Sequence, residues 1–231
     1  MPQMFAVSYI LFISSQNKDS SVKSVRLKGI YRIGPHPLDV LSIIFGSLLG
    51  DGHAEKRLYG NGTRIAFYQE HSHVSYMIYL HSLLSSFGYC NLKSPSIGTR
   101  LGIGGKVRKT VRFTTWTYTS FNWIHEIWYV NGVKVVPDCI SYYLTPLALA
   151  IWIMDDGSKV GKSLKFSTNS FTYGDCLKLI TVLNNNFGLK CTIQSAGAAD
   201  QYIIYVRKES MHTLRNIVYP YIIPEMRYKI I

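Results

Sequence analysis

Two aspartates are candidates for chemistry because each follows an apolar run of helical length and has glycine beside it. Asp51 lies in the segment Gly50-Asp51-Gly52, and Asp156 lies in Asp155-Asp156-Gly157, about a hundred residues further on. The C-terminal end of a helix carries partial negative charge, so a carboxylate there is unfavourable unless a cation lies close to it. The two segments therefore predict that Asp51 and Asp156 hold a cation.

The elements that must position these aspartates are two helices. The apolar residues before Asp51 recur at the spacing of one helical face: Leu41, Ile44, Phe45 and Leu48. A second stripe of this helix, which we expect over residues 38–52, contains only small residues: Ser42, Gly46 and Gly50. Small residues four apart let another helix backbone come close, so we expect a second helix to pack on this stripe.

The region around Asp156 repeats the region around Asp51. Thr145 is expected to cap a second helix and Pro146 to occupy its first position, with residues 147–154 running apolar into the second aspartate. The same elements follow each helix, a short strand and then a helix ending in Phe-Gly: 63–68 and Phe87-Gly88, then 163–168 and Phe187-Gly188. This repetition predicts two similar α+β halves related by a pseudo-two-fold axis, with Asp51 and Asp156 facing each other.

The composition narrows the class of partner. Apolar residues make up 47% and charged residues 16% of the 231-residue chain, which is the balance of a globular protein and not of a disordered one. Lysine and arginine number 25 against 13 aspartate and glutamate, which gives a net charge of +12. A field of this sign attracts polyanions, so nucleic acid is the leading partner.

Other classes of site are disfavoured. The four cysteines lie far apart without a Cys-x-x-Cys pair, so neither a zinc site nor a disulfide framework is expected. The apolar residues 4–13 are too few to span a bilayer. The glycine-rich segment 98–105 precedes Lys106 but lacks the Ser or Thr of a Walker loop. His71 and His73 have no further ligands at zinc spacing, and we interpret them as surface or phosphate-adjacent residues.

Residues 44–52 and 149–157 resemble the two copies of the signature of LAGLIDADG homing endonucleases, of the single-chain kind that carries both halves in one polypeptide. Further stretches are similar to intron-encoded members from organellar genomes: 31–36, 50–53, 143–147 and 220–229. The resemblance implies an α+β fold of two pseudo-symmetric αββαββα halves with antiparallel DNA-binding sheets and the two motif helices packed at the junction. We therefore expect an N-terminal extension or arm over residues 1–30, a first half over 31–137 and a second half over 138–231.

The resemblance also implies which groups bind metal. Asp51 and Asp156 match the acids of the family that bind divalent ions, and the backbone carbonyls of Gly50 and Asp155 match its usual further ligands. The implied cofactor is Mg²⁺, with two or three divalent ions shared at the helix junction. This ion suits carboxylates, and it keeps water and phosphate as its other ligands.

Lys134 and Lys229 match a pair of basic residues that lie near the scissile phosphates in the family and would stabilise the transition state. The second helix departs from the first because larger residues stand at the positions of the small stripe: Leu147, Ile151 and Asp155. Its close-packing surface should therefore use Ala148 or Ala150.

A polar residue after the first strand of each half is expected to orient the metal-bound water. Asn169 is the candidate in the second half. In the first half Tyr68, Gln69 and Glu70 are all candidates for this role. Strand alternation and an alignment of the two halves that starts from the helix point to positions one residue apart. We favour Gln69.

The strands are expected to contact DNA. Residues 107–118 alternate, which predicts a strand whose polar face, including Trp116, is free for the groove. The candidate contacts of the first half are Arg64, Tyr68, Arg100, Lys106, Arg108 and Arg112. Those of the second half are Lys165, Ser167, Tyr205 and Arg207. Such side chains can read base edges or touch phosphates.

The implied activity is that of a site-specific endodeoxyribonuclease, which makes a metal-dependent double-strand break in a long DNA target. An RNA maturase that assists splicing of its host group I intron, alone or as a dual activity, is the alternative. A glycosidase that uses the same aspartates as an acid/base pair is disfavoured by the net charge of +12. We expect a monomer that does not contact membranes and is encoded in a mitochondrion, with a chloroplast as the second choice.

Overall fold

The computed structural model describes residues 28–56 and 60–231. Nearly all of the expected N-terminal arm, residues 1–30, lies outside the described residues. Among the helices described, none combines the length and the apolar character needed to cross a membrane. All four cysteines are free thiols, as the sequence predicts.

In the described part of the first half, the main elements follow the order αββαββα: α1 (Leu38–Leu49), β1 (His53–Lys56), β2 (Thr63–Glu70), α2 (Val74–Ser86), β3 (Ile97–Leu101), β4 (Val107–Thr114) and α3 (Asn122–Trp128). The second half repeats this order: α5 (Pro146–Asp156), β7 (Gly157–Val160), β8 (Ser163–Phe166), α6 (Tyr173–Phe187), β9 (Cys191–Ser195), β10 (Tyr202–Val206) and α7 (Met211–Val218).

Short elements connect and end the halves. A two-stranded hairpin and a helical turn link the halves: β5 (Tyr129–Val130), β6 (Val133–Lys134) and α4 (Ile140–Tyr143). The 3-10 helices are η1 (Gly29–Tyr31), η2 (His71–His73), η3 (Ile103–Gly105), η4 (Thr119–Phe121), η5 (Lys208–Ser210) and η6 (Pro224–Lys229).

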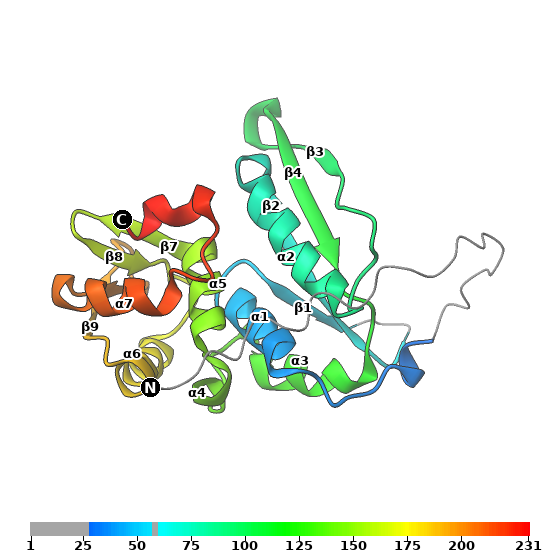
Figure 1. The fold of residues 1–231 in the computed structure, drawn as a ribbon, viewed down its shortest axis with the longest axis horizontal. Helices are drawn as coiled ribbons and strands as arrows, with labels where there is room; N and C mark the ends of the chain where they lie inside the picture. Colours follow the sequence, from blue (N-terminus) through cyan, green and yellow to red (C-terminus); the bar gives the residue numbers. More distant parts are fainter. Residues whose placement is uncertain (1–27, 57–59) are drawn as a thin grey trace, which may run out of the picture.

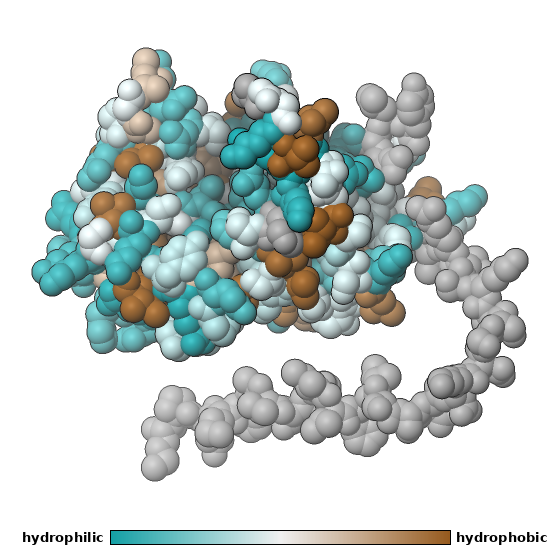
Figure 2. All heavy atoms as spheres, turned by 90° about the horizontal axis from the view of Figure 1, so that it is seen from above, coloured by the Kyte–Doolittle hydropathy of each residue, from teal (hydrophilic) through white to brown (hydrophobic). Residues whose placement is uncertain are grey.

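The two large sheets have the same topology, which confirms the expected α+β fold. Their strand orders are β1-β2-β4-β3 and β7-β8-β10-β9, and all pairs are antiparallel. Figure 1 shows the first half in blue to green on the right and the second half in yellow to red on the left, with α1 and α5 side by side between them. On the face shown in Figure 2, the hydrophobic side chains of the described residues form small separate groups among hydrophilic ones.

At the junction, α5 packs on the stripe of small residues of α1. A Cβ atom added to Gly46 would lie 2.5 Å from the carbonyl oxygen of Ala148, so the two backbones are nearly in contact there. Thr145 Oγ1 donates a hydrogen bond of 2.9 Å to Ser42 Oγ at one end of the contact, and Gly50 lies against the Asp155 side chain at the other. The stripe therefore contacts α5 as predicted, and of the two alanines considered, Ala148 meets Gly46.

The ends of several elements follow from local hydrogen bonds. Thr145 caps α5 as expected, since its Oγ1 accepts from the Ala148 amide at 3.3 Å and Pro146 occupies the first turn. The strand expected over residues 107–118 ends earlier, at Thr114. The reason is that the Trp116 amide donates to the Tyr89 carbonyl at 2.7 Å and its ring packs against the core, so the prediction that Trp116 lies on the free face is wrong.

Candidate active site at the helix junction

The C-terminal ends of α1 and α5 bring acidic groups from the two halves together. Gln69 Nε2 donates to Asp51 Oδ2 at 2.5 Å and to Asp155 Oδ1 at 3.3 Å, so one amide nitrogen bridges a carboxyl from each motif helix. Asp156 follows Asp155 directly and is also within electrostatic reach of Asp51. Gln69 can reach this point because it lies at the end of β2 and pairs with Val111, on the sheet face turned toward the helices.

The orientation of the Gln69 amide is fixed from its other side. His73 Nδ1 lies 3.1 Å from Gln69 Oε1, and because the amide nitrogen is directed at two carboxyls, this contact assigns the proton to His73 Nδ1. The two neighbours that competed with Gln69 lie elsewhere. Glu70 accepts from Arg108 at 2.7 Å, and the Tyr68 ring lies 5.4 Å from the Arg100 guanidinium.

Two lysines sit at the C-terminal ends of the motif helices, one for each half. Lys134 Nζ, from β6, donates to the carbonyls of Gly50 at 3.2 Å and Gly52 at 2.8 Å. Lys229 Nζ, from η6, donates to three carbonyls at the end of α5, those of Ile153, Met154 and Asp155. These bonds add donors at the ends of the two helices, where the Ile153 carbonyl also accepts from the Gly157 amide, and they place positive charge at the negative end of each helix.

The two ammonium groups are not equivalent. An ammonium group has three N–H donors, and the bonds of Lys229 use all three, whereas those of Lys134 use two. Lys229 is also only 5% exposed. Lys229 therefore has no donor left for a further acceptor, whereas Lys134 keeps one.

Burial and like charge perturb the titration of these groups. Burial, and next the Asp51 charge, raise the pKa of Asp156 to about 7. The same two causes raise the pKa of Asp155 well above its usual range. Burial lowers the pKa of Lys134 and of Lys229, an effect that the nearby carboxylates oppose. Buried carboxyl groups that lie close together repel each other when ionised, and a bound cation would relieve this repulsion.

The donor set fits an ion of the magnesium type. Asp51 and Asp156 supply carboxylate oxygens, and the carbonyls of Gly50 and Asp155 each have a second lone pair beside the lysine bond. In the part of the chain that the structure describes, no cluster of three or more His, Cys, Asp or Glu side chains could enclose a metal. Such a set leaves several positions to water and phosphate, which is how Mg²⁺ commonly binds.

The open face of the first sheet carries most of the expected contacts of that half. Strand pairing places Tyr68 opposite Arg112, Arg100 opposite Arg108, and Arg64 opposite Glu55, all on the face that the helices do not cover. Two of these arginines are paired with acids of the same face, Arg64 with Glu55 at 2.6 Å and Arg108 with Glu70 at 2.7 Å. Lys106 is exposed directly after η3, at the tip of the β3–β4 hairpin.

The second sheet differs in detail from the first. Lys165 pairs with Tyr205 and with Ser158, so these three residues share its open face. Ser167 follows β8, and its amide donates to the Asp156 carbonyl at 3.2 Å. Arg207 follows β10 and lines a hollow with residues of α6, on the helix side of the sheet. Asn169 is exposed and donates to Gln201 Oε1 at 3.0 Å, so its role in orienting water stays a prediction.

Three groups at the site were not assigned to it from the sequence. They are the carboxyl of Asp155, for which only the carbonyl was expected, the ring of His73, and Tyr76, whose buried hydroxyl lies 3.4 Å from the Ile151 carbonyl. Of these three groups, only Asp155 has a signal in the sequence, because the second motif has the acid pair Asp155-Asp156 where the first has Gly50-Asp51. The other two depend on the turn η2, which brings His73 back over the end of β2.

The sequence is similar to those of two yeast proteins. The chain is 54% identical over 205 residues to the cytochrome b mRNA maturase bI2 of Saccharomyces cerevisiae, covering 86% of this chain and 48% of that protein. It is 50% identical to the protein of the same name from Debaryomyces hansenii, covering 84% of this chain and 75% of that protein. The chain thus spans about half the length of the Saccharomyces relative.

The fold and the family model agree with these relatives. The homing endonuclease I-WcaI bound to its DNA recognition sequence superposes with a TM-score of 0.74 and 27% identity, covering 84% of this chain and 87% of that one. The model of the LAGLIDADG DNA endonuclease family matches residues 41–214, which include most of α1, all of α5 and both large sheets. The chain therefore belongs to the LAGLIDADG DNA endonuclease family.

Proposed function

We propose that this protein is a site-specific DNA endonuclease that makes a metal-dependent double-strand break. The observation that carries the proposal is the meeting of Asp51 and Asp155 on the Gln69 amide, with Asp156, the buried Lys229 and the half-buried Lys134 beside them. Two open sheet faces extend from this junction, and sheets placed in successive major grooves would cover a target of roughly two duplex turns. Both strands would then be reached from one site.

The chain supplies the ligands, the orientation and the charge for phosphodiester hydrolysis. Asp51, Asp156 and the carbonyls of Gly50 and Asp155 would hold two or three Mg²⁺ ions. When bound, such ions lower the pKa of an attacking water and neutralise charge on the phosphate and the leaving oxygen. Gln69 keeps Asp51 and Asp155 in place, and its amide would orient the water in the first half.

The lysines act on the negative charge that grows in the transition state. Lys134 has one unused donor that a phosphate oxygen could accept. Lys229 uses its donors on α5 and would contribute by charge alone. Preorganised positive charge in a buried site costs no reorganisation during the reaction, and removing one such group in other enzymes costs about 3 to 4 kcal/mol.

The open faces would hold the duplex. Arg64, Tyr68, Arg100, Lys106, Arg108 and Arg112 are the proposed contacts of the first half, and Lys165, Ser167 and Tyr205 those of the second. Arg207, which lines the hollow beside α6, is not proposed as a contact. The ion pairs of Arg64 and Arg108 with acids of the same face would orient these guanidinium groups. A positively charged surface of this kind gives affinity that weakens steeply with salt.

A second function is favoured by the names of the relatives. The proteins that are 54% and 50% identical to this chain are called cytochrome b mRNA maturases. We therefore propose RNA binding in support of intron splicing as the second candidate, alone or together with DNA cleavage. The cytochrome b names also support a mitochondrial origin over a chloroplast one, and the presence of both halves in one chain supports a monomer.

The deciding experiment uses the intron-free form of the insertion site as substrate. The protein is incubated with this duplex and Mg²⁺, and both strands are examined for cuts. A double-strand break that chelator abolishes is the expected result. If the DNA stays intact in the presence of Mg²⁺ and the protein speeds up splicing of the intron transcript, the endonuclease proposal is refuted and the maturase proposal is supported.

A further inference from the structure

A pocket on the second half lies apart from the helix junction and is lined by basic side chains. It has a volume of about 250 Å³, and its charged members come from four places in the fold: Lys159 of β7, Lys162 of the β7–β8 turn, Lys208 of η5 and Arg215 of α7. Of the residues that the structure describes, no acidic one lines it. Most pockets for whole small molecules are larger, at about 300 to 1,000 Å³, so this one suits a single charged group better than a metabolite.

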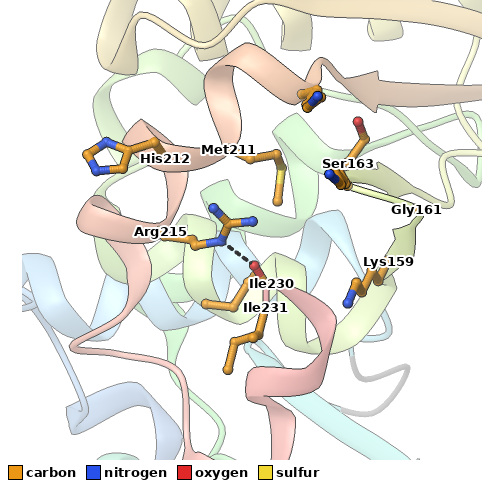
Figure 3. A pocket seen from close by; sticks show the side chains of 10 residues that line it. Lys159, Gly161, Ser163, Met211, His212, Arg215, Ile230 and Ile231 are labelled. Atoms are coloured by element: carbon orange, nitrogen blue, oxygen red, sulfur yellow. Dashed lines mark hydrogen bonds between the residues drawn. The ribbon is translucent and has the colours of Figure 1, made fainter.

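One of these charges is held in a fixed position. Arg215 Nε donates to the Ile230 carbonyl at 2.6 Å, which directs the rest of the guanidinium group into the pocket (Figure 3). Among the described residues, its two terminal nitrogens make no hydrogen bond or ion pair. Lys159 reaches toward the same space from β7 (Figure 3), and Lys159, Lys162 and Lys208 are exposed. A fixed guanidinium with exposed ammonium groups around it is an arrangement that binds phosphate.

The pocket opens on the side of the sheet that DNA would not occupy. Lys159 pairs with Leu164, which is buried under the helices, whereas its neighbour Ser158 pairs with Lys165 on the open face. Successive residues of a strand point to opposite faces, so Lys159 lies on the side covered by α7. A duplex seated on the open faces would therefore leave the pocket free.

We propose that this pocket binds backbone phosphates of a folded RNA, at a site separate from the DNA-binding sheets. A folded RNA can contact a protein on more than one side, because its helices and loops bring phosphates from distant parts of the chain together. The inference deepens the second candidate of the proposed function, since relatives 54% and 50% identical are named mRNA maturases.

The test compares two variants of the full chain that lose the same charge. The pocket variant is Lys159→Gln, Lys162→Gln and Lys208→Gln. The control variant is Lys28→Gln, Lys56→Gln and Lys93→Gln, which are exposed lysines that do not line the pocket. Affinity for a transcript of the cytochrome b intron is measured against salt, and binding and cleavage of the target duplex are measured on the same proteins.

We expect the pocket variant to bind the transcript at least tenfold more weakly and the slope of log affinity against log salt to become shallower by about 2, at roughly 0.7 for each phosphate that is no longer neutralised. Duplex binding and cleavage should stay within twofold for this variant, and the control variant should lose less than threefold in RNA affinity. Thermal unfolding should be unchanged, because all three lysines of the pocket are exposed.

Four results would overturn the proposal. Unchanged RNA affinity of the pocket variant is the first, and an equal loss in both variants is the second, since it would mean that only total charge matters. An equal loss for RNA and duplex would assign the pocket to the DNA interface. Tight binding of inorganic phosphate that leaves RNA affinity unaffected would assign it to a free anion. If the unmodified protein does not cleave DNA, only the endonuclease proposal is refuted. The RNA affinities of the pocket and control variants still test the RNA site.

Discussion

Replacing Gly46 by alanine should separate the two motif helices. The added Cβ would lie 2.5 Å from the carbonyl oxygen of Ala148 and 2.9 Å from its Cα. These are backbone atoms that cannot rotate away, so reaching an ordinary contact of 3.4 Å requires a movement of about 0.9 Å between the helices. Overpacking of this kind costs up to about 3 kcal/mol, and the better helix propensity of alanine returns about 1, which leaves a net loss of about 2 kcal/mol.

Gly174 provides the matched control. It also lies in a helix, at the start of α6, but a Cβ there would meet only Thr172 Oγ1, at 3.8 Å. Gly174→Ala should therefore stabilise the fold by about 0.4 to 1 kcal/mol. By thermal unfolding, we expect a midpoint about 4 to 8 °C lower for Gly46→Ala and about 1 to 4 °C higher for Gly174→Ala.

Cleavage should separate the two variants further. A shift of about 1 Å between the groups that hold the reacting atoms can lower a rate by about 100-fold, so Gly46→Ala should lose activity well below its unfolding temperature. Gly174→Ala should cleave at the normal rate. A Gly46→Ala protein as stable and as active as the unmodified one would refute the close approach of α1 and α5.

Three further predictions concern the site. Lys229→Met should destabilise the fold more than Lys134→Met, because it removes three hydrogen bonds at the end of α5 instead of two after α1 and because Lys229 is the more buried lysine; equal unfolding midpoints would contradict this. Metal-free protein should lose stability as the pH rises from about 4 to about 7, because the fold favours neutral Asp156, whose pKa is raised to about 7, while the unfolded chain ionises near 3.8; the shift is worth up to about 4 kcal/mol. In denaturant titrations Asp156→Asn should show a shallower slope, with the part due to Asp155 remaining, and an unchanged slope would contradict this. Gln69→Leu should slow cleavage by about 100-fold and Glu70→Gln by less than tenfold, and the reverse order in single-turnover assays would assign the water-orienting role to Glu70.

The parts of the fold that could be predicted are those fixed by local pattern. The apolar face and small stripe of α1 follow from residues within one helix, and the cap at Thr145 depends on a neighbour three residues away. The repetition of these signals predicts two halves, and the two sheets of identical order agree with it. Each of these features involves residues close in sequence, where spacing alone carries the geometry.

The rest depends on contacts between distant residues. The strand β4 ends where Trp116 turns to the carbonyl of Tyr89, and nothing in the alternation of residues 107–118 signals this. The choice among Tyr68, Gln69 and Glu70 was open because a register shift of one residue reverses the face of each side chain. The contact of Gln69 with Asp155, a residue from the other half of the chain, supports Gln69, and no local pattern signals it.

The proposal that the two halves share one cleavage centre is best tested by removing one acid at a time. Asp51→Asn and Asp156→Asn keep the size of each side chain and remove its charge, and the sheets that would hold DNA lie elsewhere. With target duplex and Mg²⁺, we expect each variant to lose cleavage of both strands while its affinity for the duplex stays within a few fold. Unimpaired cutting of either strand by Asp51→Asn or by Asp156→Asn would contradict a shared metal site at the helix junction.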